Sequence, residues 1–240
     1  ESNPANDVEG IDAAYKLAIL ASLAFHTPIK PSSIFREGIS ALHPRDFTYA
    51  QELGYAVKLL AIAKEHGTSI KARVHPALVP LDNQLATVDG VFNAIQVEGD
   101  LVGTLVFYGR GAGGGPTSST VVADTLTIAR SIAMGGTVRP RMELNRRVPV
   151  LPMSEIQTRY YFRLSVGDQP GVLAQIARVL GDQSISISAV IQKELDPAAQ
   201  TAVIVILTHP SVEKAVQTAA AQMAALPSIR QVGALIRVEH

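Results

Sequence analysis

The chain has 240 residues, 47% of them hydrophobic and 18% charged, and its mean hydropathy of +0.21 leaves room for two buried domain cores. Its 21 Lys and Arg balance its 21 Asp and Glu, so the charge predicts neither a nucleic-acid partner nor binding to an anionic membrane. Without cysteine, a signal-peptide pattern or an apolar run of roughly 18 residues, it offers no disulfides or membrane span, and we expect a cytoplasmic protein that acts on small molecules.

Residues 1–144 indicate one mixed α/β domain. Helices are assigned from apolar spacing near 3.6 residues, and strands from short apolar runs between turn residues. In chain order we expect a loop (1–10), a strongly apolar helix (12–25), a helix (47–66) that ends at Gly67, a strand (69–79), a hairpin (92–98 and 101–108) that turns at Gly99-Asp100, a glycine-rich loop (109–116) and a helix (119–133).

Residues 145–157 contain prolines and paired arginines without clear periodicity, which predicts a linker. Residues 158–240 then follow the order βαββαβ, with proline near the start of each helix, where its missing N–H costs nothing. The strands are expected at 160–166, 185–192, 202–208 and 231–238, and the helices at 171–180 and 211–226. This order predicts a ferredoxin-like unit, and the fold class of the whole chain is therefore α+β.

The first helix carries two charges of interest, Asp12 and Lys16, which lie four residues apart and share one helix face. A surface ion pair of this kind would contribute little to stability. The helix is apolar nearly all round, however, which predicts burial, and a buried acid–lysine pair favours a functional site. The upstream carboxylates of Glu1, Asp7 and Glu9 suit the ammonium of a zwitterionic substrate, although favourable placement at a helix N-terminus is a simpler reading of each.

The run ESNPANDVEGIDAAYKLAILASLAF (residues 1–25) resembles the substrate-binding signature of homoserine dehydrogenases, E-x-D-P-x-x-D-V-x-G-x-D-A-x-x-K. It departs from that signature at Asn3, where an acid is commoner. The resemblance implies NAD(P)-dependent interconversion of L-aspartate 4-semialdehyde and L-homoserine, in threonine and methionine biosynthesis. It makes Lys16 the proton donor to the nascent alkoxide and Asp12 the residue that holds Lys16 and the substrate oxygen in line, both catalytic and substrate-binding. Glu1 and Asp7 would bind the substrate ammonium.

The glycine-rich loop contains Gly111, Ala112 and Gly113 between an expected strand and an expected helix. It is neither a P-loop nor a complete dinucleotide fingerprint, and a flexible turn explains it equally well. The resemblance implies a secondary contact with NADP or NAD. The main nucleotide-binding domain, a Rossmann fold, is missing from these residues, and the first residue is Glu instead of Met, as in a fragment of a longer protein. The chain alone is therefore expected not to turn over substrate.

The sequence VGDQPGVL (residues 166–173), followed by an apolar helical run, resembles the ACT domain motif, although a packing module with a tight turn is an alternative. The resemblance implies an effector site at Asp168, Pro170 and Gly171, with threonine as the effector, and assembly into a homodimer or homotetramer through a substrate and dimerisation domain. The six histidines lack metal-ligand spacing, so we expect no metal and place them in loops or at the surface. The rival hypothesis is a non-catalytic amino-acid-binding regulator that contains an ACT module.

Overall fold

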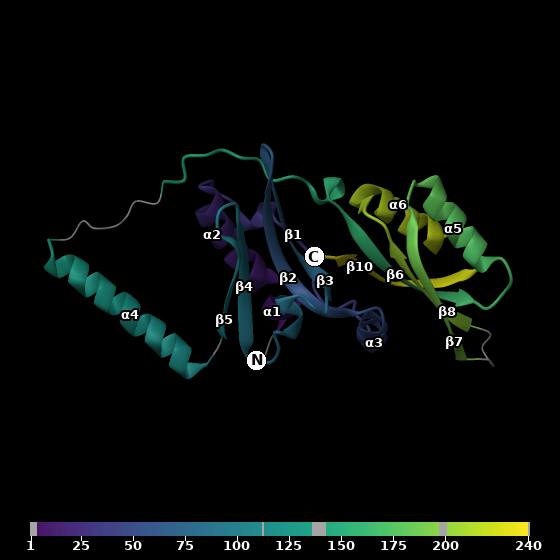
Figure 1. Ribbon diagram of the computed structural model, residues 1–240, viewed down its shortest axis with the longest axis horizontal. Coiled ribbons are helices and arrows are strands. Elements are labelled where there is room, and N and C mark those ends of the chain that lie inside the picture. The colour runs from purple at the N-terminus through teal and green to yellow at the C-terminus, as the bar shows by residue number, and fades with distance from the viewer. Residues whose placement is uncertain (1–3, 112, 136–142, 197–200, 240) are drawn as a thin grey trace. The chain divides into compact units, whose positions relative to one another are not determined.

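The computed structural model describes residues 4–111, 113–135, 143–196 and 201–239 (Figure 1). They form two compact units, one of Glu1–Pro80 with Leu144–His240 and one of Leu81–Glu143. No helix among the described residues is long and apolar enough to cross a membrane.

The first unit contains all but four of the principal elements. Before the gap in its chain these are α1 (Ala5–Val8), α2 (Ile11–Phe25), a 3-10 turn (Pro31–Ser33), β1 (Phe35–Arg36), α3 (Pro44–Glu52), β2 (Tyr55–His66) and β3 (Ser69–Pro80). After the gap they are a 3-10 turn (Met153–Glu155), β6 (Gln157–Gly167), α5 (Val172–Asp182), β7 (Ile187–Asp196), β8 (Thr201–Thr208), β9 (Ser211–Val212), α6 (Glu213–Ala224) and β10 (Ile229–Val238).

Strands β10, β6, β8 and β7 lie side by side in that order, and each neighbouring pair is antiparallel. This is the arrangement of a ferredoxin-like βαββαβ unit, so the predicted fold class is confirmed. The sheet continues beyond β10, because Arg237 and Val238 pair in parallel with Ala77 and Leu78 of β3. Strand β2 pairs with β3 along its whole length. One sheet therefore joins the N-terminal elements to the C-terminal module.

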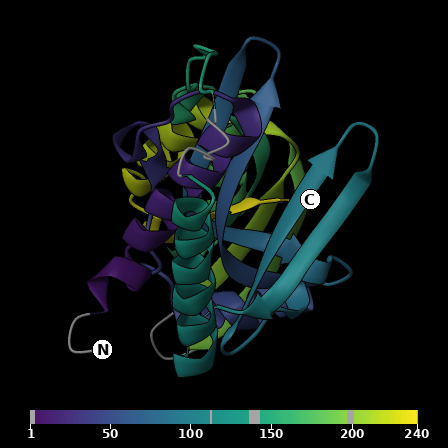
Figure 2. The same ribbon diagram turned by 90° about the vertical axis from the view of Figure 1, so that its left-hand side faces the viewer.

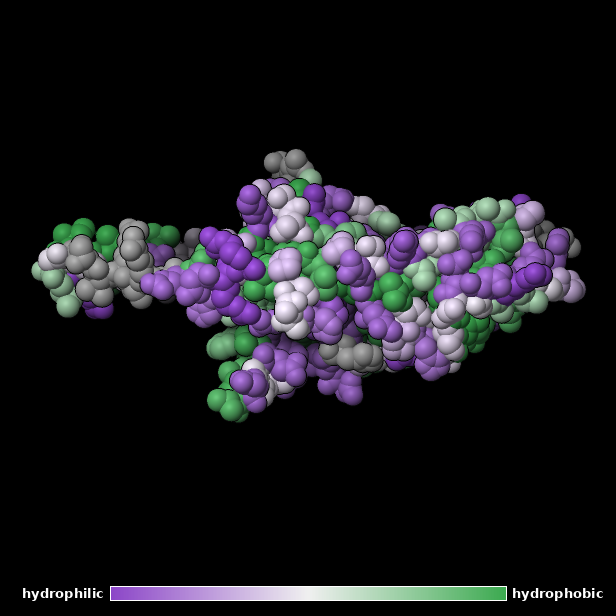
Figure 3. Space-filling model, turned by 90° about the horizontal axis from the view of Figure 1, so that it is seen from above, coloured by the Kyte–Doolittle hydropathy of each residue, from purple (hydrophilic) through white to green (hydrophobic). Residues whose placement is uncertain are grey.

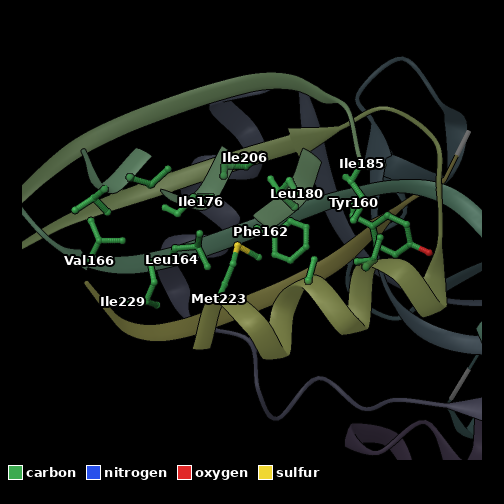
Figure 4. Close-up of a cluster of buried hydrophobic side chains, with 14 of the residues drawn as sticks. Tyr160, Phe162, Leu164, Val166, Ile176, Leu180, Ile185, Ile206, Met223 and Ile229 are labelled. Atoms are coloured by element: carbon green, nitrogen blue, oxygen red, sulfur yellow. The ribbon is translucent and has the colours of Figure 1, made fainter. Parts of the chain in front are cut away.

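Helices α5 and α6 cover one face of this module. Alternate residues of β6 point toward them, among them Phe162 and Leu164, and Met223 of α6 reaches the same cluster (Figure 4). Tyr161 faces the opposite side, where Tyr49 and Ala50 of α3 pack against the sheet. The C-terminal sheet is thus buried on both faces, and the second face is covered by an N-terminal helix.

The predicted helix over residues 47–66 is wrong. Helix α3 ends at Glu52, Gly54 adopts φ +84°, and residues from Tyr55 onward form β2. The Ala, Leu, Lys and Glu residues of this segment favour helix locally, but twelve ladder pairs with the strongly apolar β3 override that preference. Gly67 (φ +59°) lies in the two-residue turn of the β2–β3 hairpin, not at a helix end.

Smaller differences concern element ends. The loop predicted over residues 1–10 contains the short helix α1, and α6 begins at Glu213, so Pro210 precedes β9 instead of occupying a first helical turn. The predicted linker holds a 3-10 turn, and Val150 in it forms a bridge with Ile70.

The second unit contains a 3-10 turn (Gln84–Thr87), a hairpin of β4 (Phe92–Gly99) and β5 (Gly103–Arg110), and α4 (Gly114–Ala133). The hairpin is a long two-stranded ribbon (Figure 2), which confirms the predicted pairing, but its turn covers residues 100–102 because Gly99 is still paired, with Gly103. Helix α4 begins five residues before its predicted start and buries none of its described residues. Hydrophobic side chains lie at the surface where α4 is found (Figure 3).

Candidate functional site

The residues of the predicted substrate site lie at the turn between α1 and α2, which we call the elbow (residues 4–16). Gly10 caps α2 with φ +67°, and a Cβ atom there would lie 3.0 Å from Cγ1 of Val74. Both facts require glycine at this position. Helix α2 then packs on β2 and β3 through small or slender residues, namely Ala14, Leu17, Ala18 and Ala21. The close packing fixes which side of α2 carries the charges.

Asp12 and Lys16 are in contact, with 2.6 Å between Oδ2 and Nζ. Their predicted burial is wrong, because the side chains are 45% and 65% exposed. Helix α2 buries one stripe only, and its outer face keeps Tyr15 and Ile19 exposed at 58% and 62%. The sequence pattern predicted burial all round α2 because the side of the helix that faces solvent is also apolar. The pair is open to a ligand, and its exposure limits its contribution to stability to at most about 1 kcal/mol.

The other carboxylates predicted near the substrate differ in their surroundings where the structure describes them. Asp7 is exposed on α1, and Glu1 lies outside the described residues. Glu9, in contrast, has a structural contact, since Oγ of Ser40 donates a hydrogen bond to its carboxylate and Nη1 of Arg36 donates to its backbone oxygen at 3.0 Å. These contacts could not be predicted from local patterns, because the partners lie about thirty residues away in the chain.

The glycine-rich loop (residues 109–116) belongs to the second unit. The amide of Gly111 donates to the carbonyl of Val91 at 3.1 Å, and a Cβ atom on Gly111 would overlap the Asn93 side chain. Gly113 (φ +125°) is the N-cap of α4, and Ala112 lies outside the described residues. The positive φ therefore favours glycine at position 113, and the loop exposes the first amides of a long helix.

The predicted effector residues line one hollow. Asp168, Pro170 and Gly171 lie with Gln192 around a concavity of about 460 Å³ where β6 turns into α5. Gly171 (φ +89°) caps α5, so the free amides of the first helical turn begin directly after it. Nε2 of Gln192 lies 3.5 Å from Oδ1 of Asp168. A carboxylate beside a helix N-terminus offers complementary charge to an α-amino acid.

Residues 1–126 match the family model for homoserine dehydrogenase, and residues 160–226 match that for the ACT domain. The chain belongs to the homoserine dehydrogenase family. Curated relatives include homoserine dehydrogenases of Neisseria gonorrhoeae, 44% identical, and Helicobacter pylori, 43% identical, which align with 100% of this chain and 56% of their own length. A crystal structure of a homoserine dehydrogenase from Thiobacillus denitrificans has a TM-score of 0.90 at 43% identity, over 100% of this chain and 55% of that chain. The chain thus spans just over half the length of these relatives.

Among the described residues, three buried ionic clusters join the part that matches the homoserine dehydrogenase model to the C-terminal ferredoxin-like module (residues 157–239), which we call the ACT module. In the first, the fully buried Asp46 of α3 accepts from Nε and Nη2 of Arg163 at 2.6 and 3.1 Å and from Oη of Tyr161 at 3.1 Å. Asp46 also accepts from the amide of His43, which closes a capping box. Burial and the Asp46 carboxylate raise the pKa of Tyr161 far above its usual range, so Tyr161 remains a donor.

The second cluster is centred on Arg237 of β10, whose side chain is 1% exposed. Its Nε and Nη2 donate to the Glu213 carboxylate at 2.9 and 2.5 Å, and Nη1 donates to Oε2 of Glu37 at 2.6 Å. Tyr160 also donates to Glu213, at 2.9 Å. Burial opposes ionisation of Glu213, but the hydrogen bonds and charge of Arg237, together with the hydrogen bonds from Gln217 and Tyr160, hold the pKa of that carboxyl below its usual range.

The third cluster contains Arg73, His75 and Glu239. Nη2 of Arg73 donates to Glu239, Nζ of Lys64 lies 3.4 Å from the same carboxylate, and Nε of Arg73 donates to Nε2 of His75 at 3.1 Å. His75 is fully buried in β3, so its predicted place in a loop or at the surface is wrong. Burial and the charge of Arg237 lower the pKa of His75 to about 4. Sequence patterns place charged residues at the surface by default, which is why all three clusters were missed.

Proposed function

We propose that this chain is the substrate-binding and regulatory part of a homoserine dehydrogenase, which interconverts L-aspartate 4-semialdehyde and L-homoserine with NADP or NAD. The observation that supports this most strongly is the family match over residues 1–126, which includes the elbow and the Asp12–Lys16 pair. Since the chain spans 56% of its curated relatives, we assign the main nucleotide-binding domain to the remainder, upstream of residue 1. The chain alone should then lack turnover.

In this proposal Lys16 donates a proton from Nζ to the substrate oxygen as that oxygen gains charge, and takes the proton back in the reverse reaction. Asp12, 2.6 Å away, orients Nζ. Asp7 and Glu1 bind the substrate ammonium. The nucleotide, when bound, supplies or accepts the hydride. Gly111 and Gly113 fit a secondary contact with the nucleotide, because a side chain at Gly111 would displace Asn93 and the loop presents helix amides beyond Gly113.

Substitution of Lys16 tests this role in an enzyme that joins the chain to an upstream nucleotide-binding domain. Lys16→Ala should lower kcat at least about 100-fold, the scale of a lost general acid. Lys30→Ala, at another exposed lysine, is the matched control and should leave kcat unchanged. A kcat for Lys16→Ala within threefold of the control would reject the assignment.

We further propose that threonine binds at Asp168, Pro170 and Gly171. The Asp168 carboxylate would bind its ammonium, and the first amides of α5 would bind its carboxylate. Millimolar L-threonine should raise the melting temperature of the chain, because a ligand that binds the folded state alone stabilises it. Asp168→Ala should abolish the shift, whereas Asp182→Ala, at the other end of the same helix, should keep it. A wild-type chain without any shift would refute this site.

Finally, we propose that the protein is a cytoplasmic homodimer or homotetramer. Among its described residues, the second unit has a hairpin and a helix but fully buries only Ala86 of its apolar side chains, and Leu101, Phe107 and Ile132 are 96%, 60% and 70% exposed. Such surfaces are typical of subunit interfaces. Sedimentation of the chain should therefore show an oligomer, and Phe107→Glu should dissociate it. A monomer at 100-micromolar scale would contradict the proposal, and cell fractionation tests the compartment.

A further inference from the structure

The segment of residues 35–40 lies between the elbow and the buried Arg237. Within it, only Phe35 and Arg36 are in a strand, β1, and the segment contacts a different partner on each side. On one side, the ring of Phe35 stacks against the Arg237 guanidinium, with Cζ 5.2 Å from the ring centroid, and Glu37 accepts from Nη1 of Arg237 at 2.6 Å. The same short segment is thus anchored to the ACT module through a single arginine.

On the other side, the segment supports the elbow directly. The amide of Ile39 donates to the carbonyl of Val8 at 2.9 Å, and Ser40 donates to the Glu9 carboxylate. A Cβ atom on Gly38 would lie 2.6 Å from both the Val8 carbonyl oxygen and Oε2 of Glu9. The segment and the elbow are therefore in close contact at Gly38. Because this close approach leaves no room for even a Cβ atom, displacement of the segment toward the elbow would push against Val8 and Glu9.

Arg237 is in turn fixed from the ACT side. Glu213 holds it at two atoms, and Tyr160 of β6 donates to the same carboxylate. Strand β6 runs from Tyr160 to the proposed effector loop, whose Gly167 amide donates to the carbonyl of Ser228 at 2.9 Å. The distance along the strand is roughly 20 Å at about 3.3 Å per residue. The path from that loop to the elbow is therefore made of paired strands and buried hydrogen bonds.

We propose that Glu37, held by Arg237, is a positioning residue for the substrate site: it sets the elbow that carries Asp12 and Lys16 and links the elbow to the ACT module. This inference rests on the proposed function for the identity of the site. Its physical content is that loss of the Glu37 charge loosens the elbow selectively. The ACT module and the sheet should keep their stability, because Arg237 retains Glu213.

Hydrogen exchange of the whole chain tests this. Glu37→Gln should speed exchange of the elbow amides (residues 8–14) about fivefold, the scale of a weakened, partly exposed charge-assisted hydrogen bond, and leave β6 and β8 unchanged. Glu37→Asp, which keeps the charge, should restore much of the protection. The control is Glu52→Gln, because Glu52 pairs with Lys193 of β7 at 2.6 Å, also joins the two parts of the chain, and is 41% exposed against 38% for Glu37.

Equal elbow exchange in Glu37→Gln and Glu52→Gln would overturn the proposal. A uniform rise in exchange over the whole chain would also overturn it, because that would indicate a general stabilising role.

Binding of L-homoserine and L-threonine separates this inference from the proposed function. If homoserine binds, its dissociation constant should rise in Glu37→Gln and not in Glu52→Gln. If threonine raises the melting temperature, it should alter elbow exchange in the wild type but not in Glu37→Gln. Failure of either amino acid to bind the wild type counts against the proposed sites, while the ligand-free comparison still decides the role of Glu37.

Discussion

Mild acid should destabilise this chain through one histidine. Nδ1 of His75 lies 2.9 Å from the carbonyl oxygen of Pro76 and Nε2 accepts from Arg73, so the neutral ring with its proton on Nδ1 satisfies both contacts. A second proton would place two donors face to face beside Arg73. Burial, together with the charge of Arg237, lowers the pKa of His75 from 6.5 to about 4. The unfolded chain therefore takes up this proton first, and stability falls as the pH drops below 6.5.

The size of the effect follows from that difference in pKa. A full shift corresponds to about 3 kcal/mol at about 1.4 kcal/mol per unit, of which about 2 kcal/mol should be lost between pH 7.5 and 5. The pKa values of Glu213 and Glu239 are lowered by their arginine partners despite burial, so these groups stay ionised over this range. Urea unfolding at the two pH values measures the loss. His75→Gln should remove it, while His66→Gln, at an exposed position, should not; equal losses in both variants would refute the reasoning.

Two further substitutions test close contacts by urea unfolding. Gly38→Ala should lower the free energy of unfolding by roughly 1–3 kcal/mol, because the added Cβ overlaps the elbow at Glu9. The control, Gly181→Ala, lies in a helix with open space around it and should raise that free energy by up to about 1 kcal/mol. Equal effects would show that the elbow can move to accommodate the added atom. Asp46→Asn should lower the free energy of unfolding by about 3 kcal/mol, since it leaves the buried Arg163 without a counter-charge. A decrease below about 1 kcal/mol would mean that solvent reaches this pair.

The C-terminal module could be predicted from the sequence because local and tertiary preferences agree there. Alternation along β6 and the Pro170-Gly171 turn before α5 identify the elements without reference to distant residues. The N-terminal domain was harder at residues 55–66, where helix-favouring residues form β2 because β3 lies beside them. Local propensity carries no information on that partner.

The candidate site shows the same division. The spacing of Asp12 and Lys16 predicted their contact correctly, since four residues on a helix fix it. Their burial could not be predicted, because it depends on which stripe of α2 meets the sheet. The pair of Glu37 and Arg237 lies 200 residues apart, and each residue taken alone is an ordinary charge. Only the fold brings them together.

The covering of the ACT sheet by α3 leads to a last prediction, on the isolated segment of residues 157–239. In the chain, Tyr161, Val203, Val205 and Leu207 are buried on the face that packs against α3. Removing α3 exposes this face, and at about 1.5–3 kcal/mol for each fully buried side chain even partial exposure costs several kcal/mol. That is comparable with the entire stability of a small domain, about 5–15 kcal/mol.

We therefore expect the segment to unfold at lower urea concentration than the chain and to self-associate through the uncovered face. Val205→Lys separates this from association at the sheet edges: in the segment it should restore the monomer, because Val205 lies on that face, whereas in the whole chain it should destabilise, because Val205 is 1% exposed there. Sedimentation and urea unfolding of the four proteins give the answer. A segment that stays monomeric at 50-micromolar scale and unfolds at the same urea concentration as the chain would show that α3 merely rests on a module that folds independently.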